Sequence, residues 1–527
     1  MSLKLKKEII KLNEVVYAQY GQTMVESDII VPDVKPDILK ILQVDGTAIV
    51  TQKMVQQDKI VIQGNVNMNI LYHPDGGDTP GRVKSMTSTQ MFTHVVDAAG
   101  VRPNMSMFCE AEVENVDFTF LNSRKMNVRL GVGVNVKAFN PMEIEVATDM
   151  QEDSNLQTKG EIIRASNVVF EGEREVTVRD QVEVPAGKPA IAEIFKIDTR
   201  VNEREIMILE NKIVIKGDID VCTLYSSVDF AAVDGEDFER EVETVNFMEH
   251  QIPFNEVLDI EGLMDNMDGE IDYSVKEIFF EIAPDGSGDK RVINLELTVC
   301  ANVHATEIME IHSIEDAYST DGDVEIKKGL YNIEQLIGRS SAQISHRDLA
   351  PISSDMPSIA QLINCKSKPM VTGINVEDGK AHVVGMVETS ILYLSSDISN
   401  PVCAVKHKSE FTHLIEINGM EDQVVCEAKL DVNHVTFNMT TDREVELRFI
   451  ISLNARAVKA TQTEIIEEIH WLECAKIDPR PSIVIYFVQK GDTLWDIAKR
   501  YKTTPAAIIE ANALEGDTLS VGQQLMI

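Results

Sequence analysis

Hydrophobic and polar positions alternate over long stretches of this chain. Between Ile60 and Tyr72, every second residue is apolar or glycine, and the residues between them are mostly Gln and Asn. Such a period of two predicts a strand with one face on a core and the other in water. The same alternation recurs from Ile213 to Tyr225 and from Val383 to Tyr393. The pattern therefore predicts a mainly β protein with a long strand in each of three places.

The three predicted strands close three copies of one block. Residues 35–72, 188–225 and 356–393 align without a gap, and each copy has a proline 36 residues before a tyrosine and a glycine eight residues before it. These positions are Pro36, Gly64 and Tyr72; Pro189, Gly217 and Tyr225; and Pro357, Gly385 and Tyr393. A glycine inside a strand marks a bulge or a close backbone approach. We expect the three tyrosines to occupy the same place in three superposable cores.

A second periodicity follows each proline. Apolar residues fall at spacings of three and four, which predicts a stripe on a short helix of about two turns with the proline in its first turn. The residues of this stripe are Ile38, Ile41 and Leu42; Ile191, Ile194 and Phe195; and Ile359, Leu362 and Ile363.

Weaker similarity continues downstream of each block and defines three domain-sized units. We expect each unit to have its own core, because about 150 residues is an ordinary domain size. The predicted domains are three β-rich repeats at 1–146, 161–317 and 330–477, followed by a small domain at 483–527. Polar stretches at 147–160 and 318–329 and a hinge at 478–482 separate them. The predicted fold class is multidomain and mainly β, with a small α+β tail in the order βααβ.

The tail has clear helix signals. Asp492 or Thr493 is a predicted cap for a helix whose apolar stripe is Leu494, Ile497, Ala498 and Tyr501. Thr504 and Pro505 open a second helix as its cap and first residue. Trp495 falls beside the first stripe, so it either covers the edge of the core or is exposed for contact with a partner.

The net charge of the chain limits the classes of partner that it can bind. The chain has a formal net charge of −37, which argues against nucleic acid, since phosphate contacts need an excess of Lys and Arg. Its seven cysteines are scattered and form no C-x-x-C pair, which favours reduced core thiols over a disulfide framework or a zinc site. No export signal is recognisable at the start, and no apolar run of about 18 residues predicts a membrane span.

Catalytic and cofactor motifs are absent from the sequence. It has no phosphate loop, nucleophile elbow, zinc-protease motif or EF-hand loop. His94 and His413 follow Phe-Thr at equivalent places, and we expect a structural role for both. The sequence thus predicts no enzyme, with no catalytic, cofactor-binding or metal-binding residues.

Residues 486–527 resemble a LysM domain, on the strength of "GDTLWDIAKRY", "NAL" and the closing "VGQQLMI". Three β-rich repeats before a LysM domain resemble the SPOCS-type spore-coat morphogenetic proteins of spore-forming bacteria, of the clostridial SipL type. In LysM domains, sugar binds in a groove between the loop after the first strand and the loop after the second helix. The resemblance places a partner or ligand site at Lys490, Gly491, Asp492, Thr493, Leu494, Trp495, Asn512, Ala513 and Leu514.

The resemblance implies a non-enzymatic scaffold in the mother-cell cytoplasm at the forespore and spore-coat surface. Its partners would be a coat basement-layer ATPase like stage IV sporulation protein A, bound through the LysM domain, and other coat proteins. The alternative is a cell-wall protein that uses the same groove to bind N-acetylglucosamine polymers such as peptidoglycan or chitin oligomers. A wall hydrolase is disfavoured because the catalytic motifs are missing.

Overall fold

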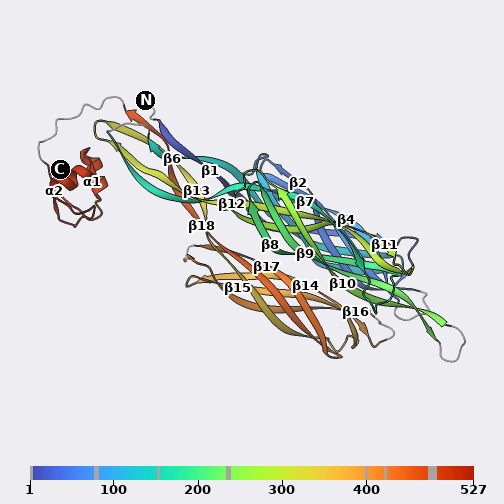
Figure 1. Cartoon of the computed structure of the whole chain (residues 1–527). Coiled ribbons are helices and arrows are strands. Elements are labelled where there is room, and N and C mark those ends of the chain that lie inside the picture. The colour runs from blue at the N-terminus through green and yellow to red at the C-terminus, as the bar shows by residue number, and fades with distance from the viewer. Residues whose placement is uncertain are drawn as a thin grey trace.

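The long alternating segments form antiparallel sheets in all three repeats (Figure 1). The computed structural model describes residues 4–75, 82–150, 155–232, 239–397, 402–420, 424–472 and 484–527. The predicted hinge at 478–482 and Cys474 lie outside the described residues. Each repeat contributes six strands as two three-stranded sheets, and the small helical domain lies at the far end of the long strands.

The first repeat shows the strand order that the other two share. Its sheets are β1-β6-β5 and β2-β3-β4. Its strands are β1 (Leu5–Ile30), β2 (Ile38–Gln56), β3 (Lys59–Pro74), β4 (Lys84–Asp97), β5 (Ser106–Asn122) and β6 (Lys125–Met150). The inner faces of the two sheets enclose one core, in which Ile62, Met68 and Val132 are almost fully buried.

The second and third repeats have the same two sheets. In repeat 2 they are β11-β12-β7 and β10-β9-β8, and in repeat 3 they are β13-β18-β17 and β14-β15-β16. The strands of repeat 2 are β7 (Leu156–Glu183), β8 (Glu193–Leu209), β9 (Lys212–Ala232), β10 (Glu239–Asp259), β11 (Asp268–Pro284) and β12 (Lys290–Ser319). Those of repeat 3 are β13 (Asp323–Pro351), β14 (Ile359–Glu377), β15 (Lys380–Ser395), β16 (Val402–Glu416), β17 (Val425–Thr441) and β18 (Glu444–Leu472).

The fixed spacing between proline and tyrosine is explained by one hydrogen bond. The Tyr72 hydroxyl donates to the carbonyl of Pro36 at 3.1 Å, and the bonds of Tyr225 to Pro189 and of Tyr393 to Pro357 are 3.2 and 2.9 Å. All three tyrosines are fully buried. The bond satisfies a buried phenol and fixes the start of the repeat to the end of its central strand. The prediction that the three tyrosines are equivalent is confirmed.

Replacing Tyr393 with phenylalanine should lower the free energy of unfolding by about 0.5–1.5 kcal/mol, the net contribution of a typical hydrogen bond. Urea denaturation of the full chain measures this effect. The matched control is Tyr331→Phe, because the Tyr331 hydroxyl bonds the carboxylate of Glu467 at a partly exposed site. An equal loss of stability in both variants would mean that the hydrogen bond to Pro357 contributes no more than one at a partly exposed site.

The predicted helices after the prolines are wrong, because these residues begin strands β2, β8 and β14. In β2 the register shifts between Ile38 and Lys40 and again between Ile41 and Gln43. A bulge inserts one extra residue into a strand, so two bulges three residues apart place Ile38, Ile41 and Val44 on the buried face. The spacing of three therefore comes from bulges and not from a helical turn.

The same bulges recur in the other repeats. The register of β14 shifts after Ile359 and after Leu362, and that of β8 shifts after Ile194. In repeat 2, Ile191 precedes the strand but is equally buried.

The recurring glycine makes room for an aromatic ring from the next strand. Gly64 pairs with Phe92, and the equivalent pairs are Gly217 with Phe254 and Gly385 with Phe411. A Cβ on any of these glycines would lie within 2.8 Å of the paired ring. The strand on the other side has a register shift opposite each glycine. Both predicted roles, a bulge and a close approach, are therefore present.

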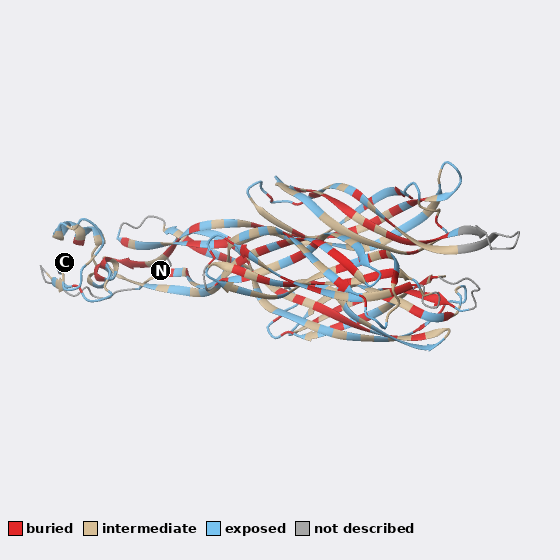
Figure 2. Cartoon of the chain, turned by 90° about the horizontal axis from the view of Figure 1, so that it is seen from below, coloured by how far each residue is buried: buried red, intermediate tan, exposed pale blue. Residues whose placement is uncertain are grey.

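The longest strands continue beyond the sandwiches as three two-stranded ribbons, β1–β6, β7–β12 and β13–β18, which we call the stalk. Figure 2 shows buried positions continuing along the stalk toward the C-terminal domain. Its core combines all three repeats: Ile10, Leu12, Ile144, Val146, Ile163, Ala165, Ile311, Ile333 and Ile465. The stretches at 147–160 and 318–329, predicted as linkers, contain the ends of these strands. The repeats therefore have their own cores and also share this one.

Candidate functional site: the polar axis and the LysM domain

Equivalent residues of the three repeats meet where the sheets that contain β2, β8 and β14 face one another. We call the charged and polar residues at this place, Gln43, Asp45, Lys196, Asp198, Asn364 and Lys366, the polar axis. Leu71, Leu224 and Leu392, each next to its repeat's buried tyrosine, belong to one apolar cluster. Beside them, a small cavity is lined by matching positions of each repeat: Gln43, Lys196 and Asn364, with Leu71, Asp198, Cys222, Leu224, Lys366, Ser390 and Leu392. The arrangement has approximate threefold symmetry.

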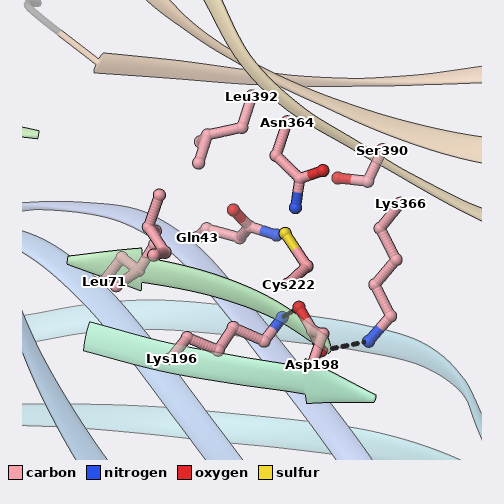
Figure 3. A pocket seen from close by; sticks show the side chains of 10 residues that line it. Gln43, Leu71, Lys196, Asp198, Cys222, Asn364, Lys366, Ser390 and Leu392 are labelled. Atoms are coloured by element: carbon pink, nitrogen blue, oxygen red, sulfur yellow. Dashed lines mark hydrogen bonds and ion pairs between the residues drawn. The ribbon is translucent and has the colours of Figure 1, made fainter. Parts of the chain in front are cut away.

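Charged groups join the repeats at this axis (Figure 3). Lys196 contacts Asp45 of repeat 1 and lies 2.9 Å from Asp198, and Lys366 of repeat 3 donates to Asp198 at 3.0 Å. Only 14% of the Lys196 side chain is exposed. Burial alone would raise the pKa of Asp198, but Lys196 and Lys366 lower it to about 2. The cavity has a volume of about 20 Å³, which is roughly the room that one water needs. Its size therefore favours a structural ion-pair network over a binding site for a larger ligand.

A second charged cluster lies between the strands β5, β11 and β17. Lys429 of repeat 3 contacts Asp272 of repeat 2, and both influence Glu110 of repeat 1. As at the polar axis, a lysine of repeat 3 meets a carboxylate of repeat 2. Glu110, Glu203 and Asp431 keep exposed surface, but the loss of part of their hydration in the crowded cluster raises the pKa of each.

Glu110→Gln should stabilise the chain slightly at pH 7, because Glu110 keeps exposed surface and solvent reduces the penalty, and this advantage should be lost as the pH falls toward 4.5, the ordinary value for Glu. A carboxyl whose folded pKa is raised destabilises the fold while it is charged, and protonation removes this penalty. Chemical denaturation at several pH values measures the difference between variant and wild type.

Glu427→Gln is the matched control, and it should change the free energy of unfolding in the opposite direction. Partial desolvation alone would raise the pKa of Glu427, whose side chain is 42% exposed, but Arg456 and Lys137 hold it below its ordinary value. Its charge therefore stabilises the fold above the unfolded pKa, and this contribution is lost as the pH falls through the folded pKa. A Glu110→Gln variant that destabilises at pH 7 would contradict the assignment.

The tail folds as predicted, as β19 (Ile485–Phe487), α1 (Leu494–Tyr501), α2 (Pro505–Asn512) and β20 (Gln524–Met526). Thr493 caps α1 by accepting from the backbone N–H of Asp496, and Thr504 caps α2 in the same way. The stripe of α1 is buried at Leu494, Ile497 and Ala498. The strands β19 and β20 pair antiparallel, which completes the βααβ order.

The predicted site residues of the tail have different environments. Lys490, Gly491 and Ala513 are exposed, whereas Leu494 is buried and Leu514 packs on the same core. Gly491 has a φ of +93°, a conformation that glycine adopts without strain. Both predicted loops thus contribute a leucine to one core and leave other members exposed.

Three polar site residues hold the loops in place. The Asp492 carboxylate accepts from the Tyr486 hydroxyl at 2.6 Å and from the Gln489 N–H at 2.8 Å. Asn512 donates to the carbonyl of Met526 and accepts from its N–H, each at 2.7 Å. Together with the Thr493 cap, these bonds give the groove loops a fixed conformation.

Trp495 faces the stalk. Its ring is half-buried and meets the ring of Tyr318 edge-on, with 4.9 Å between centroids, and its indole N–H donates to Asp316 at 2.9 Å. Lys499 lies 2.6 Å from the same carboxylate. The Tyr318 hydroxyl donates to the carbonyl of Thr503 at 2.7 Å.

One more ion pair joins the two parts, between Lys502 and Asp323 at 2.5 Å. We call Asp316, Tyr318 and Asp323 the LysM seat. The sequence did not reveal the seat, because its residues belong to β12 and β13 and only the fold brings them to the tail. The sequence shows Lys499 and Lys502 as two cations near the end of α1, but nothing in it points to Asp316 and Asp323, which lie 183 and 179 residues away.

The two histidines that follow Phe-Thr lie at equivalent places in their sheets. His94 is buried on β4 beside Gly21, and burial lowers its pKa. His94 and His413 pair with equivalent positions of β3 and β15, Ile62 and Val383, as expected from their shared Phe-Thr context. Within the part of the chain that the structure describes, six cysteines are free, and no cluster of His, Cys, Asp or Glu could hold a metal ion.

Comparison with protein families agrees with this division of the chain. Residues 37–121, 190–283 and 358–440 each match the family described as SipL, SPOCS domain, and residues 486–527 match the LysM domain. The chain carries three SPOCS domains and one LysM domain. No match was found among curated proteins or among solved structures.

The SPOCS matches begin at or next to the proline of each repeat and span β2–β5, β8–β11 and β14–β17. The strands that form the stalk flank these matches, and each pairs with a strand inside or beside them. Both families are known as binding modules, and SipL relates the chain to sporulation. None of the helices that the structure describes is long and apolar enough to cross a membrane.

Proposed function

We propose that this protein is a non-enzymatic spore-coat morphogenetic scaffold. In this proposal the LysM domain binds a coat ATPase like stage IV sporulation protein A, and the SPOCS domains support assembly of other coat proteins. The protein acts in the mother-cell cytoplasm at the forespore surface. The observation that carries the proposal is the order of three SPOCS domains before one LysM domain.

The structure supports a scaffold in two ways. The axis and the stalk join three domains into one body through shared cores and ion pairs. The LysM domain is at the far end of the stalk, away from the sandwiches (Figure 1). An arm of this kind separates one binding module from the surface of the body.

Trp495→Ala should abolish co-purification of the full chain with the ATPase. Loss of a hot-spot tryptophan typically costs 2 kcal/mol or more, about thirtyfold in affinity. The matched control is Phe487→Ala, which removes an exposed aromatic ring from β19 of the same domain. Affinity measured by biolayer interferometry, with thermal unfolding of each variant, separates lost contact from lost fold.

The same titration decides between the two function classes. Tight binding of chitin oligomers without binding of the ATPase would favour a cell-wall protein and contradict the scaffold. The candidate residues for direct contact are Lys490, Gly491 and Trp495, with the other groove residues holding the loops.

A further inference from the structure

The LysM seat covers the residue that the proposed function needs for its partner. Trp495 has Tyr318 against its ring and Asp316 on its N–H, so a partner cannot use the same ring surface and N–H while the domain is seated. By contrast, Lys490 and Gly491 at the groove loop are exposed. The seated domain thus leaves Lys490 and Gly491 exposed and covers part of the Trp495 ring and its N–H.

The seat is complementary in charge and shape to one face of the LysM domain. Asp316 and Asp323 face Lys499 and Lys502, and the ring of Tyr318 is buried in the LysM core cluster. An indole N–H bonded to a carboxylate is a charge-assisted hydrogen bond, which is stronger than a neutral one. Edge-on aromatic pairs add to this attraction.

The seat is also built into the stalk. The register of β12 shifts between Ile314 and Asp316, and such a bulge re-aims the side chains that follow it. Tyr318 then lies with its side chain in the LysM core and not in that of its own repeat.

We propose that the LysM seat is an intramolecular latch that regulates the partner site. In the closed state the stalk occupies Trp495, Lys499 and Lys502, and a partner gains these groups only after the domain leaves the seat. The proposal rests on the proposed function, because it concerns the same site. It also predicts the chemistry of the competing surface, which must present an aromatic ring beside carboxylates, as the seat does.

Population arithmetic sets the expected effect. The apparent dissociation constant equals the intrinsic constant divided by the fraction of open molecules. If about one molecule in ten is open, destroying the seat should tighten partner binding about tenfold, or 1.4 kcal/mol. The two ion pairs at the seat are partly exposed, so salt should also favour the open state.

The first measurement needs no partner. The chain has two tryptophans, so Trp471→Phe leaves Trp495 as the only indole emitter. In this background, Asp316→Ala should increase acrylamide quenching of the Trp495 emission and shift it to the red. The matched control is Glu315→Ala, since neighbouring Glu315 pairs with Lys159 of the stalk.

Zero-length carbodiimide cross-linking provides an independent reading of the closed state. It should join Lys499 to Asp316 and Lys502 to Asp323 in the full chain, whereas Lys490 should form neither link. Mass spectrometry identifies the joined peptides. Absence of both links, or equal quenching in Asp316→Ala and its background, would overturn the latch.

The second measurement uses the coat ATPase as probe. Asp316→Ala should bind it about tenfold more tightly than wild type, and Glu315→Ala should bind it as wild type does. If quenching rises but affinity stays unchanged or falls, the seat does not regulate the site and the latch is wrong. If no variant binds the ATPase, the proposed function fails, and quenching and cross-linking still decide whether the seat closes over Trp495.

Discussion

Replacing Lys196 with alanine should lower the free energy of unfolding by about 2–4 kcal/mol. Removing one partner of a buried ion pair typically costs 3–5 kcal/mol, because the other charge stays buried and uncompensated. Here the side chains of Asp45 and Asp198 are about a quarter exposed, and this contact with water reduces the expected cost. Denaturation of the full chain in guanidinium chloride measures it.

Two further variants test the cause. Lys366→Ala should cost no more than about 1 kcal/mol, because the Lys366 side chain is 46% exposed and Lys196 still pairs with Asp198. Adding Asp45→Asn and Asp198→Asn to Lys196→Ala should recover much of the loss, since both carboxylates are then neutral and Lys366, which loses its contact with the Asp198 charge, is 46% exposed. If the triple variant is no more stable than the single one, the loss comes from packing and not from charge.

Replacing Gly217 with valine should destabilise the chain by about 1–3 kcal/mol, the usual cost of overpacking a core. A Cβ at this position would lie 2.5 Å from the carbonyl oxygen of Asn202 and 2.8 Å from the ring of Phe254. The ring can move, but the carbonyl belongs to the neighbouring strand and cannot. Thermal unfolding measures the change.

Gly373→Val is the matched control. Gly373 also lies in a strand at a register shift, but a Cβ there would meet nothing within 4 Å. This variant should stay within about 0.5 kcal/mol of wild type, as most surface substitutions do. A neutral Gly217→Val would mean that the strand relaxes around the new side chain.

The sequence by itself determined the repeats, the strands and the LysM domain. Period-two alternation from Ile60 to Tyr72 specifies a strand wherever it is placed, because adjacent side chains of a strand point to opposite faces. The apolar stripe of α1 and the caps at Thr493 and Thr504 also depend only on residues that are close in the sequence. The matching proline, glycine and tyrosine positions showed that three units are alike, and the tail's motif located the loops at Lys490–Leu494 and Asn512–Leu514.

The local sequence pattern predicted the wrong element where a helix and a bulged strand have the same spacing of apolar residues. Apolar residues at Ile38 and Ile41 fit one face of a helix, and they fit equally well a strand with two bulges. The choice depends on the pairing with β3, which no short window contains. Likewise the polar stretches at 147–160 and 318–329 were predicted to separate the repeats, but their described residues include the ends of the stalk strands.

Contacts between distant segments were decided by the tertiary structure alone. Lys196 meets Asp45 across 151 residues, and Trp495 meets Asp316 across 179. The spacing of Trp495 and Asp316 is not one that a repeat or a helix would generate. Lys196 and Asp45 lie at nearly equivalent places of two repeats, but only the packing of the repeats brings them into contact. The sequence showed that Trp495 lies beside its helix stripe, and only the fold showed that the stalk covers it.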